Sequence, residues 1–204
     1  MCIRDSSHTI GIASFEGRGF MNPIDIKFKN DLLFILSRSN ASNKNNRVSA
    51  VSVQSEHKFE FANWGEEDGQ SILPTSIAFD LDNNFYLSDE HLNRISIFDL
   101  EGNFIEKWGK YGHGKGDLNG PSGIAINSDN ELLVVDHLNS RIQKFDTKGN
   151  YISSFGEFGD LEGQFNYPWG LAIDSQDNIF VADWRNNRIP VSYTHLTLPT
   201  NREV

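Results

Sequence analysis

Two ionisable residue types recur at a constant spacing in this chain. The spacing is 47 residues for Asp89, Asp136 and Asp183, and again for Arg94, Arg141 and Arg188. A carboxylate accepts backbone N–H bonds in turns, and a guanidinium donates to carbonyls and carboxylates. Positions that recur in every repeat serve the repeat itself. We therefore predict a structural role for this set, with Asn139 and Asn186, and no catalytic role.

The residues beside this recurrent set differ from repeat to repeat, so they are free to serve a ligand. They mix hydroxyl, carboxylate, imidazole, indole and guanidinium groups, a combination that suits a peptide or a small polar ligand. A competing interpretation is that the two tryptophans pack against each other and against a neighbouring repeat. The predicted ligand-binding residues are Thr75, Glu90, Ser122, His137, Trp169, Trp184 and Arg185.

Other patterns that carry chemistry are incomplete in this sequence. The glycine-rich segment 109–116 lacks the G-x-G-x-x-G spacing of a phosphate-binding loop. Residues 80–84 resemble the start of a calcium loop but lack its Gly and its distal Glu, so they predict a hairpin turn. His91 and His137 lie in equivalent loops but are offset by one position. We therefore predict no metal site and no cofactor.

The elements that position these residues are short strands. In one repeat, apolar runs bounded by Asn, Asp and Gly predict strands at 122–127, 132–135, 141–146 and 151–155. No segment shows the sustained 3.6-residue period, roughly one turn, of an amphipathic helix. Four strands per repeat at a period in the forties predict an all-β fold, a β-propeller built of four-stranded antiparallel blades.

The repeats resemble the NHL repeat, whose pattern is Pro-x-Gly, an apolar strand, an Asp, and then Asn-x-Arg. The third unit matches with Pro121-Ser122-Gly123, Asp136, Asn139 and Arg141, and the fourth with Pro168-Trp169-Gly170, Asp183, Asn186 and Arg188. In the second unit Ser76 replaces the Gly and Leu92 replaces the Asn. In the first unit Arg38 stands where the Asp is expected.

The resemblance implies part of a closed ring that usually has six blades. We expect blades at about 23–65, 66–109 and 110–156, and an incomplete blade at 157–189. The resemblance also implies three possible functions. We predict a non-enzymatic binding or scaffold propeller that presents one loop face to a protein, peptide, glycan or small polar ligand. The alternatives are a metal-dependent enzyme of the lyase or lactonase kind and an RNA-binding propeller like those of tripartite-motif proteins.

The two ends of the chain are unlike the repeats. Residues 1–5 and 191–195 can be encoded by DNA strings that are reverse complements of each other and that resemble sequencing adapters. We therefore expect 1–6 and 190–204 to be adapter-derived artefacts and exclude them from fold reasoning. The genuine segment is then 7–189, a fragment whose first strand falls near 10–15. With the true N-terminus missing, the sequence predicts no localisation.

The composition of the chain limits the classes of binding partner that we expect. The chain has 204 residues, 12% of them aromatic, and a net charge of -10. This acidic balance disfavours nucleic acid as a partner, because phosphate binding relies on Lys and Arg. No apolar run approaches the roughly 20 residues of a membrane-spanning helix. A protein, peptide or small polar ligand therefore remains the predicted partner.

Overall fold

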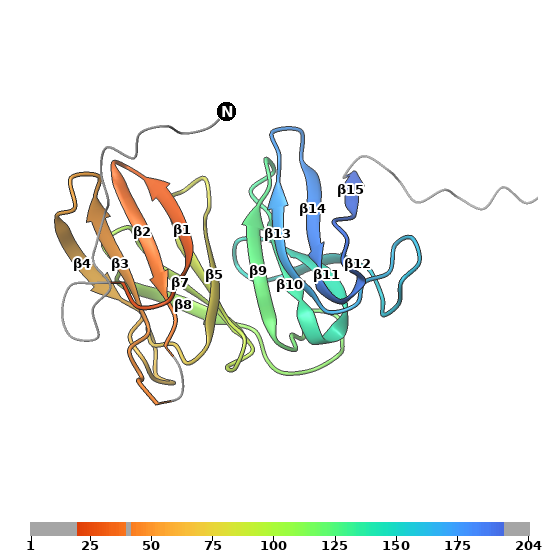
Figure 1. Cartoon of the computed structure of the whole chain (residues 1–204), viewed down its shortest axis with the longest axis horizontal. Coiled ribbons are helices and arrows are strands. Elements are labelled where there is room, and N and C mark those ends of the chain that lie inside the picture. Colours follow the sequence, from red (N-terminus) through yellow and green to blue (C-terminus); the bar gives the residue numbers. More distant parts are fainter. Residues whose placement is uncertain (1–19, 40–41, 194–204) are drawn as a thin grey trace, which may run out of the picture.

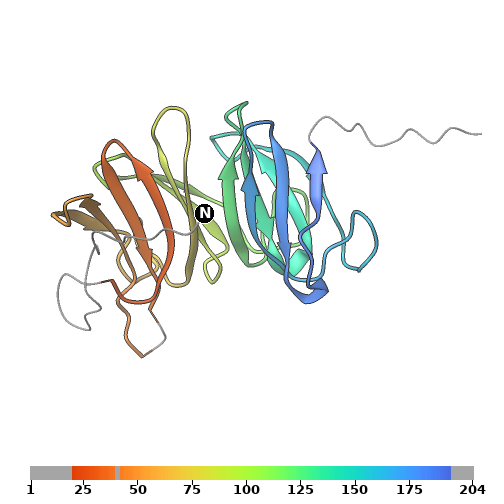
Figure 2. The same cartoon turned by 45° about the horizontal axis from the view of Figure 1, so that its top comes forward.

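The computed structural model describes residues 20–39 and 42–193. These residues form three four-stranded sheets and one three-stranded sheet, all antiparallel, which we call blades 1 to 4 in chain order. The blades stand side by side from β1–β4 at one end to β13–β15 at the other (Figures 1 and 2). This arrangement confirms the predicted all-β propeller. The strand expected near 10–15 lies outside the described residues.

The strands agree with the apolar runs of the sequence. Helical structure in the described part is limited to two three-residue 3-10 turns, η1 (His137–Asn139) and η2 (Trp184–Asn186). No described helix is long and apolar enough to cross a membrane. The strands are β1 (Pro23–Lys29), β2 (Leu32–Ser37), β3 (Arg47–Ser52) and β4 (His57–Phe61) in blade 1; β5 (Pro74–Phe79), β6 (Phe85–Asp89), β7 (Arg94–Phe98) and β8 (Phe104–Trp108) in blade 2; β9 (Pro121–Ile126), β10 (Leu132–Asp136), β11 (Arg141–Phe145) and β12 (Tyr151–Phe155) in blade 3; and β13 (Pro168–Ile173), β14 (Asn178–Asp183) and β15 (Val191–Tyr193) in blade 4.

The first strand of each blade contacts the first strand of the next, so β1, β5, β9 and β13 form the inner row. Strands β6 and β10 are buried along their whole length, whereas the outer strands β8 and β12 are exposed at their central residues. Continuous apolar strands need cover on both faces, and neighbouring blades supply it.

The hydrophobic core is divided into clusters that lie between blades. Phe34 of blade 1 packs with Phe85 of blade 2, Tyr86 of blade 2 with Leu132 of blade 3, and Val135 of blade 3 with Val181 of blade 4. Each fully buried side chain of this size contributes roughly 1.5–3 kcal/mol. A blade therefore gains its stability by stacking on its neighbours.

The turns of the blades depend on their glycine and aspartate residues. Gly149, between β11 and β12, has a φ of 82°, and a Cβ there would lie 2.4 Å from the ring of Trp108 in the preceding blade. Only glycine fits such a position without strain or collision. The predicted hairpin turn at 80–84 is present, since Asp80 accepts the backbone N–H of Asn84.

Blade 1 corrects one detail of the sequence alignment. Ser37 lies opposite Pro23 and Arg47, as Asp136 lies opposite the Pro and the Arg of blade 3. The prediction that Arg38 takes the Asp position was therefore wrong. The β1–β2 hairpin is one residue shorter than its equivalents, and the β2–β3 loop is longer. The sequence shows only the sum of these two differences, so it concealed that the Asp position had moved by one residue.

Blade 4 continues beyond Pro190, into the segment that was excluded from fold reasoning as adapter-derived. Pro190 has no N–H to donate, but its carbonyl accepts the N–H of Val181 at 3.1 Å. The strand β15 then pairs with β14 over three residues. Residues 194–204, for which we expect poor packing, lie outside the described residues.

Candidate functional site

The recurrent Asp of blade 3 collects hydrogen bonds from several elements. Its Oδ1 accepts the backbone N–H of Asn119 at 2.7 Å. Its Oδ2 accepts Nε of Arg141 at 2.7 Å and the side-chain amides of Asn139 and Gln143. Asp136 is fully buried, and a buried carboxylate must be satisfied in this way. The carboxylate thus ties the β10–β11 loop to the connection between blades.

The recurrent Arg holds that connection. Arg141 donates to the backbone carbonyls of His113, Gly114 and Asp117, so that it clamps the segment that leads from blade 2 into blade 3. Arg188 repeats the arrangement one blade later, with three carbonyls of the segment between blades 3 and 4. The Asp and Arg therefore build a rigid base for the residues beside them.

The loops that follow the Asp position and the connections between blades lie on one side of the propeller. We call this side the mouth face. The residue after the Asp position comes to the mouth face in every blade. It is Arg38 in blade 1, Glu90 in blade 2, His137 in blade 3 and Trp184 in blade 4. Arg38 and Glu90 form an ion pair at 3.0 Å between neighbouring blades. The variable positions of blades 1 and 2 therefore contact each other.

An aromatic cluster occupies the mouth face between blades 3 and 4. The ring of His137 meets Trp169 edge-on, with centroids 4.9 Å apart, and Tyr167 at 5.3 Å. His137 is buried, and its Nδ1 lies 2.9 Å from the carbonyl oxygen of Pro168. A carbonyl can only accept, so Nδ1 carries a proton in this contact. When the imidazole is neutral, Nε2 holds the lone pair.

Arg185 extends this cluster toward solvent. Its guanidinium carbon lies 4.1 Å from the ring centroid of Tyr167 and 5.7 Å from that of Trp184. Trp184 is 61% exposed and Trp169 is 38% exposed. Among the described residues, no ring contact joins the two tryptophans. We call His137, Tyr167, Trp169, Trp184 and Arg185 the aromatic cluster.

Two predicted site residues lie elsewhere. The Thr75 hydroxyl shares hydrogen bonds with Ser88 and with backbone carbonyls of blade 3, and the hydroxyl of Ser122 donates to the carbonyl of Trp169 at 2.6 Å. Both residues are buried. Their polar groups join adjacent inner strands, and the structure does not place them among the exposed groups of the mouth face.

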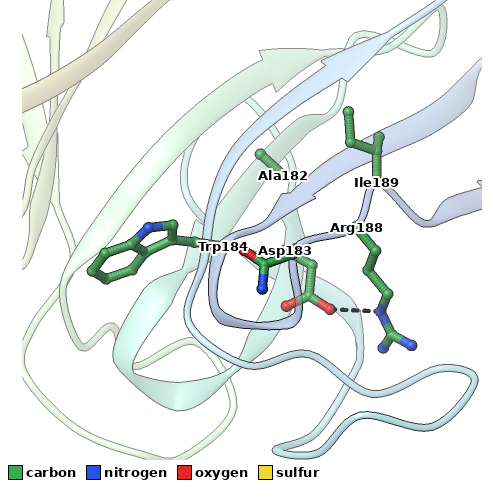
Figure 3. A pocket seen from close by; sticks show the side chains of 6 residues that line it. Ala182, Asp183, Trp184, Arg188 and Ile189 are labelled. Carbon is green, nitrogen blue, oxygen red and sulfur yellow. Dashed lines mark hydrogen bonds and ion pairs between the residues drawn. The ribbon is translucent and has the colours of Figure 1, made fainter.

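A shallow hollow of about 310 Å³ lies next to Trp184, lined by Ala182, Asp183, Trp184, Asn187, Arg188 and Ile189. The indole points away from Arg188 and Ile189 (Figure 3). In blade 3 the equivalents of Ala182 and Ile189 are buried against blade 4. The hollow is thus the type of surface that stacks on a blade, and it adjoins the aromatic cluster at Trp184.

Sequence comparison supports the repeat pattern. The NHL repeat model matches residues 118–145 and 165–191, the two segments in which the Asp, Asn and Arg contacts are complete. The chain contains NHL repeats. No curated protein matches the sequence.

Solved structures similar to this NHL propeller include both enzymes and a binding protein. Virginiamycin B lyase from Staphylococcus aureus matches 86% of this chain and 56% of its own, with 17% identity and a TM-score of 0.58. A gluconolactonase from Xanthomonas campestris matches 83% and 57%, with 13% identity and a TM-score of 0.59. An auxiliary nutrient binding protein from Bacteroides thetaiotaomicron matches 78% and 44%, with 17% identity and a TM-score of 0.54.

These likenesses show the fold. The chain spans little more than half the length of the lyase and the gluconolactonase. Because one propeller architecture supports several functions, the residues of the site must decide between them. In the described part of the chain no group of three His, Cys, Asp or Glu side chains is placed to hold a metal ion.

Sequence reasoning missed two residues of the mouth face. Arg38 was assigned to the Asp position, and Tyr167 was not considered. A signal for Tyr167 existed, because the residue before the recurrent Pro also varies, as Leu73, Gly120 and Tyr167 show. The signal for Arg38 required the strand register.

Proposed function

We propose that this NHL propeller is a binding module and that its aromatic cluster binds a peptide, glycan or small polar ligand. The observation that carries the proposal is the 61% exposure of Trp184 beside the stacked guanidinium of Arg185. Large exposed aromatic side chains are characteristic of binding surfaces. A ligand that covers the indole removes its apolar area from water, which is worth roughly 25 cal/mol per Å².

The position of the cluster also supports binding. It combines residues of blades 3 and 4, which come from η1, η2, the segment before β13 and β13 itself. The loops that carry η1 and η2 rest on the Asp–Arg contacts. A site held by such rigid elements loses little conformational entropy when a ligand binds. The cluster offers an apolar plane, a cation and an imidazole together, which suits a ligand with both polar and apolar groups.

The experiment is a screen of the whole chain against glycan and peptide arrays, followed by measured affinities for the hits. Trp184→Ala should weaken binding by about tenfold, which corresponds to a hot-spot residue of about 1.4 kcal/mol. The free energy of unfolding should change little, because the indole is mostly exposed. Phe158→Ala is the matched control, since Phe158 is 69% exposed and lies in the connection between β12 and β13, where it pairs with Phe165 and is not a member of the cluster.

The opposite pattern would contradict the proposal. If Trp184→Ala lowers the melting temperature while the folded fraction binds as before, the indole packs the protein and does not bind the ligand.

A further inference from the structure

Arg185 differs from every other arginine in the described part of the chain. Arg38 pairs with Glu90, Arg47 approaches Glu60, and the three recurrent arginines donate to backbone carbonyls. Arg185 is exposed, and its guanidinium has no hydrogen-bond acceptor among residues 20–39 and 42–193. None of the five N–H groups of this side chain has an acceptor within those described residues.

The guanidinium is nevertheless held in place. The backbone N–H of Arg185 bonds the carbonyl of Asn166 at 3.1 Å, and the side chain lies over Tyr167 with 4.1 Å between the guanidinium carbon and the ring centroid. A cation over an aromatic face is attracted by the negative charge of that face. Stacking occupies the face of the guanidinium and leaves its N–H edge open, the edge that binds a carboxylate with two bonds.

Tyr167 is held in a backbone conformation that its side chain disfavours. Its φ is 55°, in the left-handed region, and the equivalent residue of blade 3 is Gly120 with a φ of 65°. A bulky residue at positive φ is strained, and such strain concentrates at functional sites. Glycine would satisfy the backbone at this position, as it does in blade 3, but it would not support Arg185.

We propose that Arg185, held over Tyr167, binds the carboxylate of a ligand whose adjoining aromatic or apolar group stacks on Trp184. The ligand class is an anion with the carboxylate one or a few bonds from a planar group, such as the C-terminal end of a peptide. This inference rests on the proposed function, because it names the ligand of the same cluster. It adds a charge requirement that the proposed function does not contain.

The test uses hippurate, a benzoylated glycine with a free carboxylate, and its uncharged amide as the matched ligand. Titrations of the whole chain are followed by calorimetry and by the indole N–H signals in NMR spectra. Hippurate should bind at least about tenfold more tightly than the amide, as expected for a charge-assisted bidentate contact. Its affinity should fall with added salt, and the indole signal of Trp184 should shift.

Three variants separate the contributions. Arg185→Gln should remove the preference for hippurate over the amide, and Arg185→Lys should keep only part of it, because an ammonium cannot make the bidentate contact. Lys148→Gln removes the same charge from an exposed turn outside the cluster and should leave the preference unchanged. Tyr167→Gly should weaken hippurate binding while the melting temperature changes by less than about 4 °C.

Several results would overturn the inference. Equal affinities for hippurate and its amide, or an Arg185→Gln variant that keeps the preference, would show that Arg185 does not bind the carboxylate of the ligand. Tighter binding of phenyl phosphate than of hippurate would replace the carboxylate with a phosphate. No binding of hippurate at millimolar concentration would exclude the carboxylate class. In each of these cases, an uncharged glycan or peptide whose binding is weakened by Trp184→Ala would still support the proposed function.

Discussion

Blades 2 and 3 carry the same Asp and Arg but use the carboxylate differently. In blade 2 Asp89 accepts four backbone N–H groups, from residues 72, 73, 91 and 92. In blade 3 Asp136 accepts one backbone N–H and three side-chain donors, including Nε of Arg141. As a result, Nε of Arg94 is buried without a partner in the part of blade 2 that the structure describes.

The difference follows from the residue two positions before the Arg. It is Asn139 in blade 3, whose amide donates both to Asp136 and to the carbonyl of Gly112, and it is Leu92 in blade 2. Leu has no donor, so the carboxylate of Asp89 is satisfied by the backbone of the loop. A recurrent residue can therefore keep its position in the repeat while its partners change.

The largest effect should come from removing the carboxylate of blade 3. Asp136→Ala removes the carboxylate acceptor of Arg141 Nε, and it removes one of the two acceptors of the Asn139 and Gln143 amides, in a buried site. We expect the free energy of unfolding to fall by about 3–5 kcal/mol, as when one partner of a buried ion pair is removed. Urea unfolding followed by fluorescence measures the change. Asp129→Ala, at an exposed turn of the same blade, should stay within about 0.5 kcal/mol of the parent.

An intermediate effect should come from rebuilding blade 2 on the pattern of blade 3. Leu92→Asn supplies the missing amide next to Asp89, and a net intramolecular hydrogen bond contributes about 0.5–1.5 kcal/mol. We expect the free energy of unfolding to rise by that amount. Leu138→Asn introduces the same group one position earlier in the loop of blade 3, where the side chain is exposed, and should have no such effect. A destabilised Leu92→Asn variant would mean that Leu92 matters through its packing.

The smallest effect concerns the exposed carboxylates of the hairpin turns. Hydrogen bonds from the side chain and backbone of Asn178 lower the pKa of Asp174 below its ordinary value of 3.8. The pKa values of Asp99 and Asp146 are also lowered, since hydrogen bonds from the turn outweigh the raising effect of burial. A carboxyl group with a lowered folded-state pKa stabilises the fold above its unfolded pKa and loses this contribution as the pH falls through the folded value.

The melting temperature should therefore decline as the pH falls below about 4, the ordinary range of these groups. Asp174→Asn should reduce the decline and cost little at neutral pH. A variant with the same acid-induced decline as the parent would show that other carboxyl groups control it.

Much of the fold was predictable from the sequence because the signal is local and repeated. The strands expected at 132–135 and 151–155 match β10 and β12 to within one residue. Short apolar runs between turn residues predict strands. Because the runs recur at an interval of 47 residues, each blade supports the prediction made for the others. The residues of the mouth face were less predictable. Arg38 was misplaced because the sequence shows only the net difference between the shorter hairpin of blade 1 and its longer loop.

By itself, the sequence determined the blade: its four strands, its turns, and the Asp and Arg that recur. These features depend on residues close together in the chain or separated by a fixed interval. Only the tertiary structure decided which variable residues share a surface. Thr75 and Ser122 are buried because the next blade stacks on them. Tyr167 and Arg185 meet because the segment that enters blade 4 passes beside its own β14–β15 loop. Such contacts depend on how whole blades pack, and spacing along the chain does not encode them.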